Sequence, residues 1–414
     1  MNKIIQFDKD YLLKESKVFC MFPWSHLNVT PKGDVYPCCS NNYTSPFGNT
    51  RVSSLKEVFN GEQMKQLRLN MLNDIPSKIC EFCYKHEEAG PFSFRTYSIE
   101  QFSKRFDELI PTTNEDGTMD EFKMHYFDIR FSNICNFKCR TCGAEFSSQW
   151  AAEMKKHHDK KHPIIIHADK EGNLLKEVLE QIENIDLAYF AGGEPLITDE
   201  HYVILEEMIR KGRTDITLRY NTNASTIKYK KHNILELWKH FKRVELSCSI
   251  DHYGEKAEWL RHGTDWGKIE SNLLTFRKLD YISFQINTVF SIFNYFTLGE
   301  FYEYLKSKDI IREKDWYNSL YLAVHPSYYS AKSMPKMLKA EAKGKAKAFC
   351  LYNNQNYPTL ARLVTDAINF ADTENTWSEN KQKFFGHTGS IDRIRSESFA
   401  ETFPELTSLL DEDE

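Results

Sequence analysis

Short hydrophobic runs separated by polar stretches recur along the middle of the chain. Six of them have the length and the β-branched and aromatic content of strands. They span residues 127–131, 185–190, 216–220, 244–250, 284–290 and 320–324. Strands that alternate with helices along a chain usually pair in parallel, so this pattern predicts βα units and an α/β fold.

Polar and apolar residues alternate within two of these runs. In the first, Asp128 and Arg130 would share one face, and the apolar residues between them would face the helices. In the fourth, Ser247, Ser249 and Asp251 share a face. A polar inner face is unusual in a closed barrel with a packed core, and it suits an open barrel that houses a cofactor and a substrate.

The first ninety residues follow a different pattern. Residues 27–29 and 35–36 flank a turn that contains Gly33, which predicts a β-hairpin. Residues 52–72 carry apolar side chains at helical spacing and predict a helical segment that leads the chain back to the cysteines of this module. A helix is also expected over residues 360–371, near the end of the chain.

Four cysteines of the N-terminal ninety residues form a candidate metal site: Cys20, Cys38, Cys80 and Cys83. A hairpin cysteine combined with a Cys-x2-Cys pair is a sound framework for thiolate ligation. The spacing alone fits a four-cysteine zinc ribbon as well as an iron–sulfur cluster. Cys39 adjoins Cys38, but adjacent cysteines rarely both reach one metal, so Cys38 is the expected ligand.

Composition narrows the class of protein. The chain has 414 residues, 41% of them hydrophobic and 14% aromatic, which is typical of a globular protein of two to three domains. The net charge of −5 provides no basic field, so neither nucleic acid nor an acidic membrane is an expected partner. The first twenty residues lack the apolar core of a signal peptide. We therefore expect a cytoplasmic protein whose cysteines bind metal rather than form disulfides.

A second cysteine group, Cys135, Cys139 and Cys142, directly follows the first predicted strand with the spacing C-x3-C-x2-C. Thiolates select zinc, copper or iron–sulfur clusters. A closed zinc site needs four protein ligands, and this loop supplies three. Three cysteines on a four-iron cluster leave one iron free for a ligand that is not protein. A zinc knuckle completed by a distant residue, or a coincidence of buried cysteines, are the alternatives.

This triple, followed some fifty residues later by the segment Ala-Gly-Gly-Glu-Pro at residues 191–195, resembles the radical S-adenosylmethionine (SAM) enzymes. The resemblance implies that the three cysteines hold a [4Fe–4S] cluster whose open iron is chelated by SAM. It also implies that Gly192, Gly193, Glu194 and Pro195 bind the amine of the SAM methionyl group. Six βα units fit the partial (β/α)6 TIM-like barrel of that family.

Further SAM contacts are implied after the third and fourth strands. Asn223 lies in a segment similar to the Thr-Asn-Gly end of the family, with Ala224 in the place of glycine. Ser249, Asp251 and Arg261 resemble the ribose and carboxylate contacts of such enzymes. Locally, a capping asparagine or a surface arginine explains these residues equally well.

The N-terminal module is similar to the twitch or SPASM auxiliary domain of radical SAM enzymes, in which a Gly-x4-Cys element, here Gly33 to Cys38, precedes a Cys-x2-Cys pair. Four cysteines imply one auxiliary [4Fe–4S] cluster on Cys20, Cys38, Cys80 and Cys83. In the family this domain usually follows the barrel, whereas here it comes first.

The resulting prediction divides the chain into four parts: an auxiliary module over residues 1–90, a linker over 91–124, a radical SAM partial barrel over 125–330 and a helical extension over 331–414.

The implied activity is reductive cleavage of SAM to a 5′-deoxyadenosyl radical, which abstracts hydrogen from a substrate. A peptide or protein side chain is the favoured substrate, a small metabolite the alternative, and an external one-electron reductant of the flavodoxin or ferredoxin type the expected partner. A non-catalytic iron–sulfur or zinc scaffold is the competing class.

Overall fold

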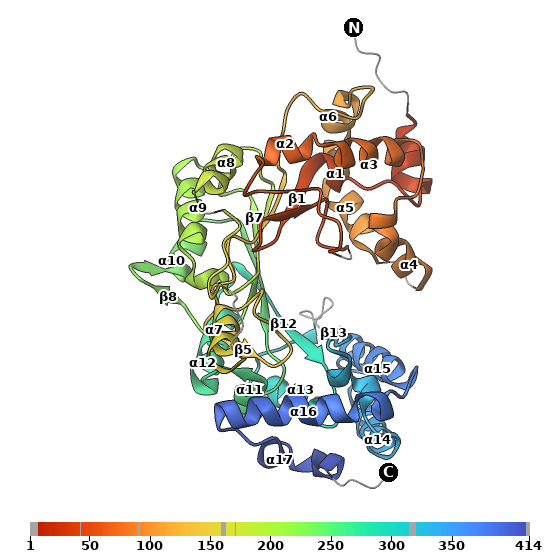
Figure 1. Cartoon of the computed structure of the whole chain (residues 1–414), viewed down its shortest axis with the longest axis vertical. Coiled ribbons are helices and arrows are strands. Elements are labelled where there is room, and N and C mark those ends of the chain that lie inside the picture. Colours follow the sequence, from red (N-terminus) through yellow and green to blue (C-terminus); the bar gives the residue numbers. More distant parts are fainter. Residues whose placement is uncertain are drawn as a thin grey trace. The chain divides into compact units, whose positions relative to one another are not determined.

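The structure is a computed structural model that describes residues 7–41, 43–89, 92–158, 163–169, 171–313 and 320–410 (Figure 1). The chain forms two compact units, which are described separately. The first comprises Met1–Asn133, Ile165–Arg219 and Glu236–Arg243, and the second comprises Ile134–Ile164, Tyr220–Leu235 and Val244–Glu414.

The predicted N-terminal hairpin is confirmed in the first unit. Strand β1 (His26–Val29) pairs antiparallel with β2 (Asp34–Tyr36), which in turn pairs with β3 (Gly48–Asn49). Gly33 in the turn has a φ of +86°, and a Cβ there would lie 2.7 Å from the carbonyl oxygen of Ala168. A residue with a side chain fits this turn poorly, so glycine is required.

Strand β1 also pairs in parallel with β4 (Tyr126–Ile129), which pairs in parallel with β6 (Leu187–Phe190). In this register Asn28 lies opposite Asp128, and the Asn28 amide donates to a carboxylate oxygen of Asp128 at 2.8 Å. The N-terminal hairpin thus continues the parallel sheet of the first unit, a pairing that the sequence analysis did not predict.

The helical pattern predicted over residues 52–72 is confirmed, but the segment is divided. Two helices occupy this segment, α2 (Leu55–Phe59) and α3 (Glu62–Leu72). Ser54 and Glu57 form a reciprocal capping box at the start of α2, and Gly61 is the N-cap residue of α3. Gly61 has an extended backbone and ends the helical conformation between α2 and α3. The apolar periodicity nevertheless continues across this break.

The first unit contains further α-helices among its described residues. The segment expected as a linker, residues 91–124, contains two of them, and its Phe102, Phe106 and Leu109 are buried; the domain boundaries stay a prediction. These helices are α1 (Phe22–Ser25), α4 (Glu81–Ala89), α5 (Phe94–Phe102), α6 (Phe106–Leu109), α8 (Asn173–Gln181) and α9 (Asp199–Arg210).

In the second unit, β10 (Arg243–Ser249) pairs in parallel with β12 (Ile282–Phe290), and β12 pairs in parallel with β13 (Leu320–Leu322). With β4, β6 and β7 (Thr217–Thr222), all six predicted strands are present. Helices separate them along the chain, which confirms the α/β class. The short strands are β5 (Lys138–Cys139), β8 (Lys228–Tyr229), β9 (His232–Asn233) and β11 (Arg261–His262).

The C-terminal part of the second unit is helical, as expected, and α14 and α15 pack against one another (Figure 1). Helix α15 (Pro358–Asp372) confirms the helix predicted over residues 360–371. The other helices are α7 (Ser148–His158), α10 (Ile234–Trp238, which begins in this unit), α11 (Gly254–Leu260), α12 (Trp266–Arg277), α13 (Leu298–Ser307), α14 (Lys336–Asn353), α16 (Trp377–Arg395) and α17 (Phe399–Thr402). None of the described helices combines the length and apolar character of a membrane span.

Candidate cluster and cofactor sites

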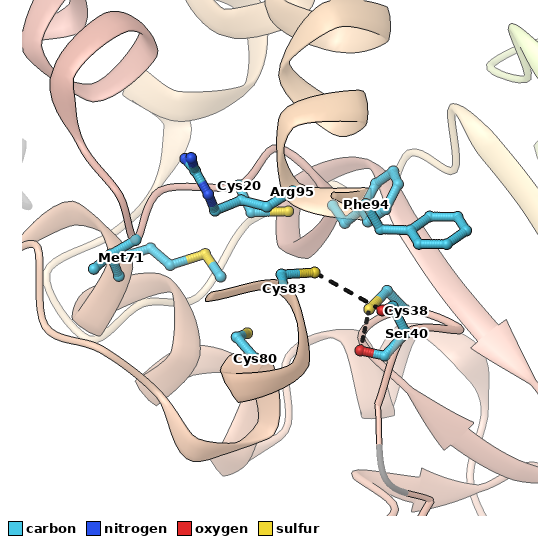
Figure 2. A pocket seen from close by; sticks show the side chains of 10 residues that line it. Cys20, Cys38, Ser40, Met71, Cys80, Cys83, Phe94 and Arg95 are labelled. Carbon is cyan, nitrogen blue, oxygen red and sulfur yellow. Dashed lines mark hydrogen bonds between the residues drawn. The ribbon is translucent and has the colours of Figure 1, made fainter. Parts of the chain in front are cut away.

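The four N-terminal cysteines line one cavity of the first unit (Figure 2). Cys20 precedes α1, Cys38 follows β2, Cys80 precedes α4 and Cys83 lies within it. The empty space at this cavity, adjoining solvent included, is about 280 Å³. These are Val18, Cys20, Phe22, Cys38, Ser40, Met71, Cys80, Cys83, Phe94 and Arg95.

Cys38, and not its neighbour Cys39, is among the residues that line this cavity. The Cys38 thiol lies 3.6 Å from the carbonyl oxygen of Ser40, and the Cys83 thiol lies 3.8 Å from the hydroxyl of the same serine. Burial raises the pKa of Cys39 to about 12, and the carboxylate of Asp128 adds to this effect. The charged neighbours of Cys39 thus include Asp128, whereas those of Cys38 are other thiols.

The chemistry of the four thiols fits an iron–sulfur cluster. Burial raises the pKa of Cys20 to about 12. Burial raises the pKa of Cys38 well above its usual range, and the nearby thiols of Cys39, Cys80, Cys20 and Cys83 raise it further. Thiols crowded in this way become thiolates only when a positive metal compensates their mutual repulsion.

Among the described residues, no three His, Cys, Asp or Glu side chains are close enough to hold one ion. Ligands of a single tetrahedral zinc would have to converge on one point, about 2.3 Å from each sulfur. In a four-iron cluster each iron binds its own thiolate, so the ligands surround the group instead. The four thiols that line the cavity offer one ligand to each iron of such a cluster.

The second cysteine group lies in the second unit, in the loop around β5. This two-residue strand pairs antiparallel with β11, so that Cys139 lies opposite Arg261. The guanidinium Nη1 of Arg261 is 3.8 Å from the Cys139 sulfur. Trp150 of α7 donates from its indole nitrogen to the Cys139 carbonyl oxygen at 2.6 Å. Cys142 is exposed, whereas Cys135 is half-buried.

Asn223 contacts this cysteine loop directly. Its amide nitrogen donates to the side-chain oxygen of Asn136, between Cys135 and Cys139, at 2.9 Å. Its own side-chain oxygen accepts from the backbone of Ser225. The next residue, Ala224, has a φ of +58°, the left-handed conformation that glycine adopts most easily. Asn223 therefore both caps its turn and orients the loop.

Asp251 and Arg261, both implied as SAM contacts, are paired with one another. The Arg261 guanidinium donates to both carboxylate oxygens of Asp251, at 2.8 and 3.0 Å, and both side chains are largely buried. Burial disfavours the charge on Arg261, but Asp251 and Cys139 outweigh it and hold the pKa of this arginine above its ordinary value. Ser249, the last residue of β10, lies opposite Asn287 of β12.

His252, next to Asp251, gives a test of acid stability. It is buried, and its Nε2 lies 3.0 Å from the hydroxyl of Thr297. Burial, helped by the charge of Lys256, lowers the pKa of His252 to about 3. In the unfolded chain a histidine takes up its proton near pH 6.5. Between pH 6.5 and pH 3 the proton therefore binds only the unfolded state, and the unfolding free energy decreases as the pH falls through this range.

We expect this histidine to account for about 2 kcal/mol of the unfolding free energy lost between pH 7 and pH 5. Urea unfolding of the cluster-free chain at both pH values measures the loss. The variant His252→Gln should lose correspondingly less over this range, and the exposed control His240→Gln should behave as the parent does. Equal pH slopes for the parent and His252→Gln would contradict the assignment.

The Gly-Gly-Glu-Pro turn lies in the first unit, directly after β6. Gly192 and Gly193 have φ values of +80° and +44°. A Cβ on Gly192 would lie 2.6 Å from the stem of Arg130, which packs against the turn. Glu194 is almost fully buried and accepts a hydrogen bond from the backbone of Leu196 at 3.1 Å. The glycines thus allow a close backbone approach, and Glu194 supplies a buried carboxylate.

Replacing Gly192 by alanine should destabilise the folded chain. The left-handed backbone and the contact with Arg130 together should cost about 2–4 kcal/mol in unfolding free energy. The control is Gly267→Ala in the first turn of α12, where a Cβ would meet only a carboxylate oxygen of Asp265, at 3.6 Å. Urea unfolding compares the two, and an equal effect of both substitutions would show that the turn tolerates a side chain.

Both cysteine groups lie within segments that match known families. Residues 20–84 match the family described as an iron–sulfur cluster-binding domain, SPASM. Residues 129–306 match the radical SAM superfamily.

The chain carries a radical SAM domain and, N-terminal to it, a SPASM domain.

These two domains imply [4Fe–4S] clusters and SAM as the cofactors of this radical SAM protein, and they favour an iron–sulfur cluster over the zinc ribbon at the N-terminal cysteines. Among curated proteins, none matches the chain.

Solved structures of similar proteins include anSMEcpe with bound AdoMet and the Cp18Cys peptide, at 19% identity and a TM-score of 0.34; the match covers 54% of this chain and 58% of that one. Streptococcus suis SuiB bound to the precursor peptide SuiA matches at 16% identity and a TM-score of 0.33, covering 54% of this chain and 44% of that one. The radical SAM chain therefore spans less than two thirds of either protein.

Sequence reasoning missed several residues that surround the cysteines. Arg95 lines the N-terminal cavity and is fixed by a double contact with Glu87, at 2.8 and 2.5 Å. Trp150 contacts the cysteine loop of the second unit, and Arg140, which belongs to that loop, donates to the carbonyl oxygen of Trp259. No short motif marks these side chains, whose partners lie 8 positions away for Arg95, 11 for Trp150 and 119 for Arg140. Only the position of Arg140, directly after Cys139, provided a signal.

Proposed function

We propose that this protein is a radical SAM enzyme that cleaves SAM reductively and abstracts hydrogen from a substrate. The observation that carries the proposal is the division of its cysteines: four line one cavity, and three occupy a separate loop that has no fourth cysteine in its sequence. Three thiolates leave one iron of a four-iron cluster open to SAM, whereas four thiolates complete a second cluster.

The cluster and SAM, when bound, supply one-electron chemistry that yields a 5′-deoxyadenosyl radical. The protein contributes ligands and positions. Cys135, Cys139 and Cys142 would hold the cluster, and the buried carboxylate of Glu194 would accept hydrogen bonds from the SAM ammonium.

Further side chains would orient the rest of SAM. The glycines of the Gly192–Pro195 turn expose backbone groups for a close approach. Arg261, held by Asp251, would pair with the SAM carboxylate, and Asn223 and Ser249 would contact the nucleoside. The bidentate contact with Asp251 fixes the plane of the Arg261 guanidinium in advance.

The N-terminal cysteines would hold the auxiliary cluster. Because Cys20, Cys38, Cys80 and Cys83 all line the cavity, each of its four irons has a protein thiolate available. A cluster ligated in this way has no open iron for a substrate. This arrangement supports a role in accepting an electron from the substrate rather than in binding it, and hence an oxidative reaction.

The SPASM domain supports a peptide or protein side chain as the substrate, with a small metabolite as the alternative. An external one-electron reductant of the flavodoxin or ferredoxin type would supply the electron that initiates the reaction. The protein would then work in the reducing cytoplasm, where thiolate ligands persist.

The test is anaerobic reconstitution with iron and sulfide, followed by incubation with dithionite and SAM. We expect about eight irons per chain and formation of 5′-deoxyadenosine. Absence of 5′-deoxyadenosine despite a full iron load would favour a non-catalytic scaffold, and zinc without iron would remove both clusters. Transfer of deuterium from labelled candidate peptides into 5′-deoxyadenosine would then identify the substrate.

A further inference from the structure

Two networks of charged residues connect the cysteine loop of the second unit to the end of α16. The first centres on Arg140, which directly follows Cys139 and is almost completely buried. Its guanidinium donates to the carboxylates of Asp392 and, at 2.5 Å, Glu397. The same group lies over the ring of Trp259, 3.3 Å from its centroid, and donates to the Trp259 carbonyl oxygen at 3.1 Å.

The second network centres on Arg395, in the last turn of α16, whose side chain has no exposed surface. Arg395 contacts both carboxylate oxygens of Glu153 on α7, at 2.8 and 3.2 Å. Glu153 also accepts from the ammonium of Lys138, the residue before Cys139, at 2.5 Å. Arg395 lies 4.8 Å from the ring of Trp150, which holds the Cys139 carbonyl oxygen.

These networks hold the residues on both sides of Cys139. Regular structure in the loop is limited to β5, so backbone pairing alone constrains it weakly. Buried ion pairs are expensive to desolvate and are a weak source of stability, but they specify one geometry. The loss of one partner leaves an unpaired charge in a poorly solvated environment, and this charge changes the midpoint potential of any nearby redox group.

We propose that the segment from Asp392 to Glu397 is part of the cluster site, and that Arg140 and Arg395 are positioning residues that fix Cys139 and set the electrostatic potential at its cluster. The proposal rests on the function proposed above. It assigns a role to the C-terminal helices, which lie outside the two matched families.

The networks predict shifts of opposite sign in the midpoint potential of the cluster that binds SAM. Arg140→Met removes a cation and leaves Asp392 and Glu397 without their shared arginine, so the cluster should become harder to reduce. Glu397→Gln removes an anion while Asp392 still pairs with Arg140, so the cluster should become easier to reduce. The matched control is Arg393→Met, which changes an exposed arginine of the same helix.

The measurement is potentiometry of the full reconstituted chain, followed by electron paramagnetic resonance, with the signal that changes on SAM addition used to identify the cluster. A second readout is the rate at which a ferrous chelator extracts iron. In Arg140→Met, about four of the eight irons should be extracted about tenfold faster than in the parent chain. Arg393→Met should match the parent in both measurements.

Unchanged potentials, or shifts of the same sign in both variants, would overturn the proposal. If Arg140→Met fails to fold, Glu397→Gln still decides, because a shift toward easier reduction supports the electrostatic role and an unchanged potential refutes it. A parent chain without a SAM-responsive signal would instead refute the proposed function, so the two failures are distinguishable.

Discussion

A chain in which Cys135, Cys139 and Cys142 are all replaced by alanine should form no detectable 5′-deoxyadenosine and should keep about four irons. The three thiolates are the only proposed protein ligands of the SAM cluster, so their removal abolishes the electron transfer into SAM. The auxiliary cysteines line a cavity of the first unit, and none of them belongs to the altered loop. Iron analysis and product detection after anaerobic reconstitution measure both effects.

The matched control for this variant is Cys350→Ala. Cys350 is a half-buried free cysteine of α14 whose thiol contacts the carbonyl oxygen of Ala361 at 3.4 Å. Its loss should leave about eight irons and the parent rate of product formation. Near-zero residual iron in the triple variant would mean that the N-terminal cavity holds no cluster of its own.

The substitution Arg68→Met should destabilise the chain by about 3–5 kcal/mol. Arg68 is completely buried in the first unit, and no carboxylate of the described residues pairs with it. Its guanidinium donates instead to the carbonyl oxygens of Pro23 and Phe59, both at 2.8 Å, and of Gly117, at 3.0 Å. Methionine preserves much of the volume but leaves these three acceptors unpaired.

The effect of Arg68→Met is measured as the change in unfolding free energy of the cluster-free chain in urea. The control is Arg210→Met on α9, where a largely exposed arginine pairs with Glu207. That surface contact should contribute no more than about 1 kcal/mol. A loss below about 1 kcal/mol for Arg68→Met would show that water reaches the freed carbonyl groups.

The sequence was sufficient to predict features that depend on local patterns or on special residue types. The six strands were predictable because their apolar runs are short and are bounded by polar segments. The four cysteines that share the N-terminal cavity were predictable because few residues other than cysteine serve as soft ligands. The break between α2 and α3 was missed, although Gly61 was a visible signal, because the apolar periodicity continues across it.

Features that depend on distant partners were not predictable. Arg140 and Asp392 are 252 positions apart, and neither carries a local mark of its partner. The same holds for the pairing of β1 with β4, whose partner residues are 100 positions apart. The reciprocal contact of Asp251 with Arg261 also escaped the sequence analysis, which treated each residue as a separate contact to SAM.

The parallel pairing of β1 with β4 has a consequence for how this architecture could have arisen. An auxiliary domain appended through a tether can be moved from one end of a polypeptide to the other without loss. Here, removal of the first ninety residues would strip the neighbour from β4 and expose four residues of unpaired backbone, an edge prone to intermolecular association. Recombination could therefore move this module to another position in the chain only if another strand took the place of β1 beside β4.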